Sequence, residues 1–421
     1  MTAKNHWEIS ATCLAAFKAC PTRFRLAYIE GLRPLEQTES QRQGTTWHKL
    51  LEIATSKPGE PCQVCGFRSL DRMADPDCPV CEGGGLTPDD SPLDRAVRWL
   101  DARYATVPAS IEPTVWAVER VTLAYSLAGW LWLYANTPID TVAREIKYRF
   151  PLRNPANGRA LPRVERLGII DRLVRWGDRI MVGEYKSTSK PIDSGSTYWD
   201  RLQLDGQISN YCLVARELQA AGQLTQYGIT PEDPPIAGVL YDVWHKPGIK
   251  PAKLTQAETK TFLETGDYCD QHFEIDVYRG EPRYTVNGIK AEITWGPESK
   301  PKKDGTVPPR PFAIRETPDM YGARVLKEIV ENPGKYFARR ELPRTDADLK
   351  AFEWEMYHQY QVMRSMNKAD HWWTCGNQCE ATFRCQYTPI CYHKQAVFDG
   401  KTCPPGFKRI YDIQQPAGDE E

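Results

Sequence analysis

One stretch of the sequence, GIIDRLVRWGDRIMVGEYKS (residues 168–187), sets Asp171, Glu184 and Lys186 among strand-forming residues. The Gly-Asp pair at 177–178 predicts a type II′ turn, and a hairpin closed there places Asp171 directly opposite Glu184. Lys186 then shares a face with Glu184. Two opposed carboxylates repel each other, and a divalent cation such as Mg²⁺ removes that repulsion. The lysine could hold a water or stabilise charge on a reacting phosphate. The alternative is a solvated face with an ordinary ion pair.

The composition is that of an ordinary globular protein. The chain has 421 residues, of which 41% are hydrophobic and 26% charged, and its formal net charge is −1. This length suits one large domain or two to three smaller ones. A nucleic acid would have to bind a local basic surface, because the protein as a whole has almost no net charge to attract it. The longest apolar stretch, Leu123–Ala135, is too short to span a bilayer, and the N-terminus has no apolar signal region. We therefore expect a cytoplasmic protein that does not contact membranes.

Three further stretches accompany the hairpin: KACPTRFRLAYIEGL (18–32), GTTWHKLLE (44–52) and QLDGQISNY (203–211). Together with GIIDRL and VGEYKS, they resemble the motifs of the PD-(D/E)XK nuclease superfamily in its RecB-like branch, and they follow the order of that branch. Phage exonucleases and the nucleases of CRISPR adaptation are similar in style. The resemblance implies an α/β, restriction-endonuclease-like core, in which helices flank a central mixed β-sheet, and metal-dependent hydrolysis of DNA.

The same resemblance implies roles for individual residues. His48, Asp171, Glu184 and the main-chain carbonyl of Tyr185 would hold Mg²⁺ or Mn²⁺, and Lys186 would position or activate the attacking water. Taken alone, His48 could equally be a surface histidine of a helix.

A helix is predicted over about 198–219. Gln203, Gln207 and Tyr211 lie on one stripe of it at i, i+4 and i+8. In the family this helix contacts DNA or steadies the site, so Gln207 and Tyr211 are candidate catalytic residues; a polar edge is the alternative. The neighbouring stripe is predicted to face the core, and it consists of Leu204, Ile208, Ala215 and Leu218.

Other elements position these residues. Strands are predicted over 145–152, 164–176, 179–187 and 237–244, and helices over 92–104, 136–144, 318–331 and 345–366. Glu145 begins the first of these strands, where related nucleases often have a glutamate near the site. Glu52 lies one turn after His48 and could orient its imidazole or pair with Lys49.

Four cysteines lie close together in the sequence as Cys62-x2-Cys65-x12-Cys78-x2-Cys81. Disulfides are rare in cytosolic proteins, and two CxxC pairs at this spacing are typical of a tetrahedral thiolate site for Zn²⁺. We therefore predict a zinc ribbon inserted over residues 58–86. Its role is a staple for a loop or a contact with DNA or a partner; unligated cysteines are the alternative.

A second group of cysteines lies near the C-terminus. In many RecB-like nucleases, a 4Fe–4S cluster joins one cysteine before the core to three after it. The resemblance implies that Cys20, Cys379, Cys385 and Cys391 hold such a cluster. The commonest family spacing has Cys-x2-Cys where this chain has Cys379-x5-Cys385, so Cys375 is a rival ligand. Four thiolates suit zinc as well as an iron–sulfur cluster. A local zinc site formed by Cys375, Cys379, Cys385 and Cys391 is therefore an alternative, as are free structural cysteines.

The predicted organisation has four regions: an N-terminal helical part of the nuclease domain (1–57), the zinc-ribbon insertion (58–86), the PD-(D/E)XK core with helical and loop insertions (87–370), and the C-terminal cysteine cluster and tail (371–421). We predict a Mg²⁺- or Mn²⁺-dependent deoxyribonuclease, preferably an exonuclease, that acts on single- or double-stranded ends in recombination, end processing or phage and defence metabolism. No GxxxxGKS/T loop is present, so unwinding would need a helicase or recombination protein as partner. The alternatives are a catalytically silent DNA-binding or assembly subunit on the same fold, and a zinc-ribbon nucleic-acid adaptor.

Overall fold

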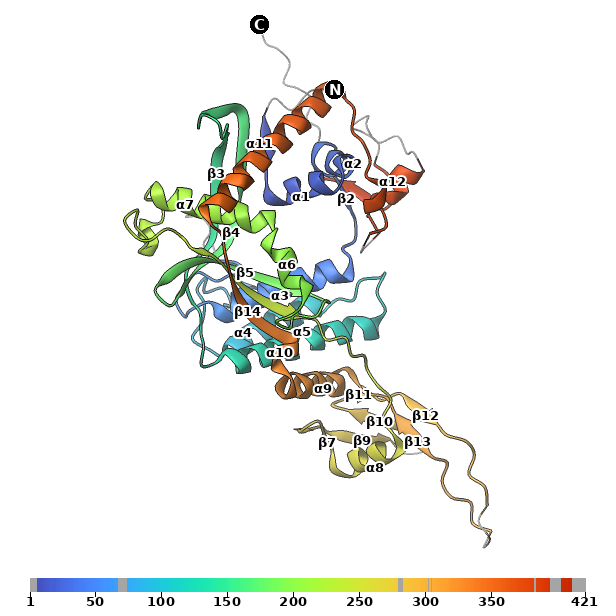
Figure 1. Cartoon of the computed structure of the whole chain (residues 1–421). Coiled ribbons are helices and arrows are strands. Elements are labelled where there is room, and N and C mark those ends of the chain that lie inside the picture. The colour runs from blue at the N-terminus through green and yellow to red at the C-terminus, as the bar shows by residue number, and fades with distance from the viewer. Residues whose placement is uncertain are drawn as a thin grey trace.

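The computed structural model describes residues 6–66, 74–278, 283–301, 303, 305–381, 384–393 and 403–410. Within these ranges, a mixed sheet of six strands lies at the centre and helices cover both of its faces (Figure 1). A smaller lobe extends from one end of the molecule. The end of the predicted tail, residues 411–421, lies outside the described residues.

The sheet is organised around one long strand, β4 (Ala160–Trp176). Along one edge, β4 pairs antiparallel with β3 (Asp140–Arg153). Along the other edge, it pairs in parallel with β1 (Trp7–Ile9) near its start and antiparallel with β5 (Arg179–Thr188) near its end. Trp176 pairs with Arg179, as predicted, and Gly177 has a φ of +63°, which suits the first position of a type II′ turn.

Two more strands complete the sheet. β6 (Gly238–His245) runs parallel to β5, and β14 (Phe337–Pro343) runs antiparallel to β6. Seven of the eight residues of β6 are buried, as expected for a strand that is covered on both faces. β6 therefore anchors the far edge of β5, whose near edge is only partly paired with β4.

Helices on the first face pack against Ile170, Val182 and Val243 of the sheet. They are α6 (Thr197–Gln203) and α7 (Gly206–Ala220), with α1 (Ala11–Ala19) and α11 (Asp346–Ala369) packed on α7. Capping fixes where they start: Asp205 accepts the N–H of Gln207 at the start of α7, and Thr345 forms a capping box at the start of α11.

The second face carries α3 (Glu39–Thr55), α4 (Pro92–Tyr104), α5 (Pro113–Tyr134) and α9 (Pro318–Glu331). They form one core with Tyr185, Trp244 and Phe337 of the sheet. β5 therefore alternates: Val182, Glu184 and Lys186 face the α7 side, and Gly183 and Tyr185 face the α3 side. No helix among the described residues is long and apolar enough to cross a membrane.

The smaller lobe is built on residues between β6 and α9 and has its own core, which includes Phe262, Phe273 and Ile314. In Figure 1 it lies apart from the central sheet, next to α9. Its elements are α8 (Gln256–Thr265), β7 (Asp267–Tyr268), β8 (Gln271–His272), β9 (Ile275–Tyr278), β10 (Arg283–Val286), β11 (Ile289–Lys290), β12 (Ile293–Trp295) and β13 (Phe312–Ile314).

The short elements at the chain ends lie together. The N-terminal ones are α2 (Pro21–Phe24), a π-helical turn (Arg25–Ile29) and β2 (Leu32–Pro34); the C-terminal ones are α12 (Thr388–Tyr392) and β15 (Phe407–Arg409). β15 pairs antiparallel with β2. Three further short elements are the 3-10 turns Thr225–Tyr227 and Gly376–Gln378 and the helix α10 (Pro333–Tyr336).

Two predictions of local structure were wrong. The helix expected near 136–144 is strand from Asp140 onward, and the true helix is α5, which precedes it. The single helix expected over 198–219 is two helices, because Asp205 starts a new one. Leu204 falls in the break and is 83% exposed, contrary to its predicted place in the core, whereas Ile208, Ala215 and Leu218 are buried.

Candidate active site

The candidate site lies where β4 and β5 separate. Their last paired residues are Arg172 and Gly183, and beyond this point β5 pairs only with β6. Asp171 and Glu184 are the next residues on the two strands, at the mouth of the wedge where the strands separate. The observed register agrees with the predicted turn, but the pair Asp171–Glu184 itself lies beyond the last paired residues.

Helix α3 brings His48 to the wedge. A side chain at Gly44 would place its Cβ 3.2 Å from the hydroxyl of Ser187, so glycine allows the helix to approach β5 closely. One turn later, His48 Nδ1 lies 3.6 Å from Asp171 Oδ2. The side chains of His48 and Asp171 are 36% and 31% exposed, so both reach solvent. An imidazole beside two carboxylates is a set of donors that suits a divalent metal.

Glu184 is 2% exposed, and its Oε2 has no hydrogen-bond partner among the described residues. Burial raises the pKa of Glu184, the charge of Asp171 raises it further, and Lys186 and His48 oppose both effects. A buried carboxylate oxygen without a partner is costly. A cation held between Glu184 and Asp171 would remove that cost, so the residues present fit a metal ion.

Lys186 is held by three acceptors. Its Nζ lies 2.8 Å from Glu184 Oε1 and 3.4 Å from Asp205 Oδ2, and it donates to Gln207 Oε1 at 3.1 Å. Gln207 in turn donates to the hydroxyl of Tyr211 at 3.1 Å. Burial alone would lower the pKa of Lys186, but Glu184 and Asp205 outweigh it and raise the pKa above its ordinary value. The structure thus brings Gln207 and Tyr211 to the site, while Gln203 ends the preceding helix α6.

Beside the wedge, an open pocket of about 460 Å³ runs between α3, α4 and the strands β3 and β4. His48, Asp171, Tyr185 and Glu145 line it. Glu145 lies in β3 with a φ of +50°, which is strained for a residue with a side chain. Glu52 also lines the pocket, and its Oε2 lies 2.5 Å from Lys49 Nζ, which favours the ion pair over a role in orienting His48.

Cys62, Cys65, Cys78 and Cys81 converge. Their sulfur atoms lie within 4.8 Å of one another, and zinc bonded to four thiolates at about 2.3 Å needs sulfurs about 3.8 Å apart. Short turns shape the loop: Gly66 donates its N–H to the carbonyl of Cys62, where a Cβ would lie 2.1 Å from that oxygen. Residues 67–73 of the predicted ribbon lie outside the described residues.

The cysteine loop packs against the helices that flank the site. Lys49 of α3 donates to the carbonyl of Gln63 at 2.6 Å, and Arg98 of α4 donates to the carbonyls of Pro79 and Val80 at 3.2 Å. Cys62 and Cys78 belong to the same core as α3 and α4. A filled site would thus tie together the two helices that border the pocket.

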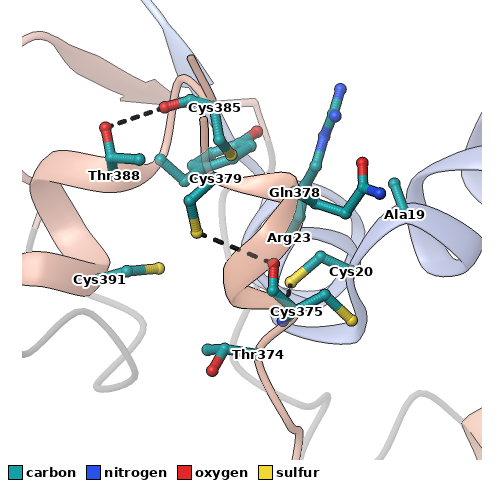
Figure 2. Close-up of a pocket in the computed structure, with 11 residues that line it drawn as sticks. Ala19, Cys20, Arg23, Thr374, Cys375, Gln378, Cys379, Cys385, Thr388 and Cys391 are labelled. Carbon is teal, nitrogen blue, oxygen red and sulfur yellow. Dashed lines mark hydrogen bonds between the residues drawn. The ribbon is translucent and has the colours of Figure 1, made fainter. Parts of the chain in front are cut away.

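The second cysteine group unites both ends of the chain. Cys20 and the C-terminal residues Cys375, Cys379, Cys385 and Cys391 line one pocket (Figure 2). The Cys20 sulfur accepts the N–H of Cys375 at 3.4 Å. In Figure 2, the sulfurs of Cys20, Cys379 and Cys391 point toward the middle of the pocket, whereas that of Cys375 points to one side.

These five cysteines are more widely spaced than the first four. Among the described residues, the Cys62 group is the only set of three or more His, Cys, Asp or Glu residues whose ligand atoms all lie within 4.8 Å of one another. The ends are also held without a metal: Tyr387 donates to the carbonyl of Leu32 at 2.9 Å, and Thr22 donates to the carbonyl of Trp373 at 2.8 Å.

A family model, that of the PD-(D/E)XK nuclease superfamily, matches residues 8–392, from β1 to the end of α12. The chain therefore belongs to the PD-(D/E)XK nuclease superfamily, whose members are generally metal-dependent nucleases. The mixed sheet flanked by helices agrees with that fold. No curated protein matches the chain.

Sequence reasoning missed two contributors to the site. Asp205 caps α7 and contacts Lys186, and the signal was present as an Asp directly before Gly206 in the middle of a predicted helix. Arg172 lies on Tyr185, with its guanidinium carbon 3.7 Å from the ring centroid. It directly follows Asp171 in the sequence, and no sequence pattern distinguishes it from an exposed arginine.

Proposed function

We propose that this protein is a Mg²⁺- or Mn²⁺-dependent deoxyribonuclease that acts as an exonuclease. The observation that carries the proposal is the pair His48 and Asp171, 3.6 Å apart, together with the buried Glu184 on the next strand. Oε2 of Glu184 has no hydrogen-bond partner among the described residues, and its Oε1 lies 2.8 Å from Lys186 Nζ. Membership of the nuclease superfamily supports the same conclusion.

Each residue has a defined part in the proposed reaction. His48, Asp171, Glu184 and the carbonyl of Tyr185 would hold the metal ion, which when bound favours deprotonation of water and stabilises charge on phosphate oxygens. Lys186, an ammonium with three acceptors around it, would turn one N–H from these acceptors to the attacking water and stabilise the negative charge that develops on the phosphate oxygens. Gln207, supported by Tyr211, would keep Lys186 in place. Attack of the water oxygen on phosphorus breaks the phosphodiester bond to the leaving strand.

Cleavage of end-labelled DNA tests the proposal. Wild type, Lys186→Ala and Asp171→Ala would be compared on single- and double-stranded DNA in Mg²⁺, Mn²⁺ and EDTA. We expect metal-dependent cleavage by wild type only, and a product ladder that shows the polarity. Tight DNA binding by metal-loaded wild type without any cleavage would instead identify a silent binding or assembly subunit.

The two cysteine groups are proposed to hold different metals. The compact geometry of Cys62, Cys65, Cys78 and Cys81 supports zinc in an insertion over 58–86, and its packing on α3 and α4 supports a structural role. The wider group supports a 4Fe–4S cluster held by Cys20, Cys379, Cys385 and Cys391. Iron and zinc contents of anaerobically purified wild type, Cys375→Ser and Cys391→Ser decide the ligand set: Cys375→Ser should keep its iron.

The biological setting is proposed from the resemblance to RecB-like nucleases. That resemblance favours DNA recombination, end processing, or phage and defence metabolism in the cytoplasm. The sequence has no nucleotide-binding GxxxxGKS/T loop, so duplex unwinding would need a helicase or recombination protein as partner.

A further inference from the structure

The pocket beside the wedge contains a buried arginine with unused hydrogen-bond donors. Arg172 is 2% exposed, and its Nε and one terminal nitrogen, NH2, have no hydrogen-bond partner among the described residues. Within the same residues, no carboxylate oxygen lies within 4.0 Å of its guanidinium. Stacking on Tyr185 compensates part of the charge. The Tyr185 hydroxyl is also buried, and no described residue forms a hydrogen bond with it.

A second arginine increases the positive charge. Arg144 of β3 is the direct cross-strand partner of Arg172, and its side chain is 11% exposed. Like charges opposed across two strands repel each other. Arg144 donates to the carbonyl and hydroxyl of Thr55 and lies 3.6 Å from Glu60 Oε2, so it has partners of its own. Within the part of the chain that the structure describes, the neighbouring Arg172 contacts only the aromatic ring of Tyr185 through its charged group.

The backbone is arranged to make room for Arg172. A Cβ at Gly183 would lie 2.6 Å from Arg172 Nε and 2.8 Å from its Cγ. Glycine at this ladder position therefore lets the guanidinium lie flat across β5 and over Tyr185. An arginine that only filled space would not need a residue without a side chain at position 183.

The place of the pocket indicates its ligand. Arg144 and Arg172 line the same pocket as His48 and Asp171, so an anion there lies next to the reacting phosphate. Arg103, an exposed residue of α4, and the half-buried Trp99 complete the rim. The side of the pocket formed by Arg144 and Arg172 offers unused N–H and O–H donors with an aromatic ring beside them, which suits a phosphate group and its adjoining base, while Glu52, Glu145 and Asp171 line other parts of the pocket.

We propose that Arg172, supported by Arg144 and the Tyr185 hydroxyl, binds a phosphate group of the DNA substrate. This phosphate is the one next to the phosphate that is hydrolysed. This inference rests on the proposed nuclease function. Arg172 is then a specificity-determining residue, because it fixes the register of the strand on the metal site. The phosphate comes either from a strand end, as a monoester, or from within a continuing strand, as a diester.

The first test measures cleavage kinetics of metal-loaded Arg172→Gln and Arg172→Lys on oligonucleotides with phosphorylated and hydroxyl ends. The matched control is Arg179→Gln, an exposed arginine of the same sheet paired with Glu341. Loss of hydrogen bonds to a charged group predicts a KM about 10- to 100-fold higher for Arg172→Gln, with kcat within about threefold. Arg172→Lys should restore only part of the lost affinity, because lysine lacks the planar guanidinium that donates two parallel hydrogen bonds. An effect confined to phosphorylated ends identifies a terminal phosphate, and an equal effect on both identifies an internal one.

The second test does not depend on cleavage. Binding of inorganic phosphate to the metal-free protein in EDTA would be measured by calorimetry for wild type, Arg172→Gln and Arg103→Gln. We expect Arg172→Gln to lose at least tenfold in affinity and Arg103→Gln, at the rim, to lose less. Wild-type phosphate binding that survives in folded Arg172→Gln, or an unchanged KM, overturns the proposal and leaves Arg172 as a structural arginine. If Arg172→Gln does not fold, Arg172→Lys carries the same comparison. Phosphate binding by wild type without any DNA cleavage would instead refute the nuclease function alone.

Discussion

Asp205 has two roles that substitution can separate. Its Oδ1 accepts the N–H of Gln207 at 3.0 Å and caps α7, while its Oδ2 lies 3.4 Å from Lys186 Nζ and also accepts the hydroxyl of Tyr241 at 3.5 Å. Asparagine keeps a capping oxygen but loses the charge, whereas alanine loses both. The pair Asp205→Asn and Asp205→Ala therefore distinguishes the stability of the helix from the positioning of the lysine.

The expected magnitudes follow from these contacts. Asp205→Ala should lower the free energy of unfolding by about 1 kcal/mol, the usual cost of a lost N-cap, and Asp205→Asn by less than about 0.5 kcal/mol. Hydrogen bonds to charged groups contribute about 1.5–3 kcal/mol. We use the lower end, because Glu184 and Gln207 still hold Lys186 in both variants. About 1.5 kcal/mol lost from the transition state corresponds to a kcat about tenfold lower.

Urea unfolding followed by circular dichroism measures the first effect, and single-turnover cleavage of labelled DNA measures the second. Thr345→Ala is the matched control, because Thr345 caps α11 and makes no contact with Lys186. It should lose similar stability and keep its kcat. Wild-type kcat in Asp205→Asn would refute the role of Asp205 in positioning Lys186. Equal stability of the two Asp205 variants would refute the capping argument.

Three further predictions concern close packing and metal content. Gly44→Val should push α3 away from Ser187 and raise the Mn²⁺ concentration needed for half-maximal cleavage several-fold, in contrast to a milder Gly44→Ala; an unchanged metal titration would contradict this. Cys62→Ser should remove about one zinc per chain and lower the melting temperature in a thermal scan, and full zinc content would exclude the site. Gly183→Ala should displace the guanidinium of Arg172 and raise KM for DNA much as Arg172→Gln does, whereas a wild-type KM would show that the close approach is unimportant.

The parts of the fold that the sequence predicted are those written in local patterns. The register of β4 and β5 follows from a two-residue turn at Gly177, because such a turn leaves no freedom in pairing. The four-cysteine group follows from fixed spacing. The convergence of the chain-end cysteines could be expected only from the family resemblance, because Cys20 and Cys375 are distant in sequence.

Other features depend on contacts that no local pattern encodes. The pairing of Arg144 with Arg172 could not be derived, because the β3–β4 ladder shifts register between the Pro151 and Arg153 pairs and again near Thr141. In a ladder that contains bulges, the length of the connecting loop does not determine which residues pair. Helix α5 was missed for another reason: it packs against α3, α4 and α9 and is apolar over most of its circumference, so it lacks the one-sided pattern of a surface helix.

The separation of β4 from β5 explains how one strand can serve two parts of the proposed site. Alternation along β5 places Glu184 on the α7 face and Tyr185 on the α3 face, whereas Asp171, Arg172 and Tyr185 all line the pocket beside α3. If the two strands stayed paired, their backbone hydrogen bonds would close the sheet between Glu184 and the pocket that contains Asp171 and Arg172. Because pairing ends at Arg172–Gly183, one DNA strand could reach both faces at the wedge. A one-residue slip would exchange the faces of Glu184 and Tyr185, so the tight turn at Gly177 fixes the chemistry as well as the fold.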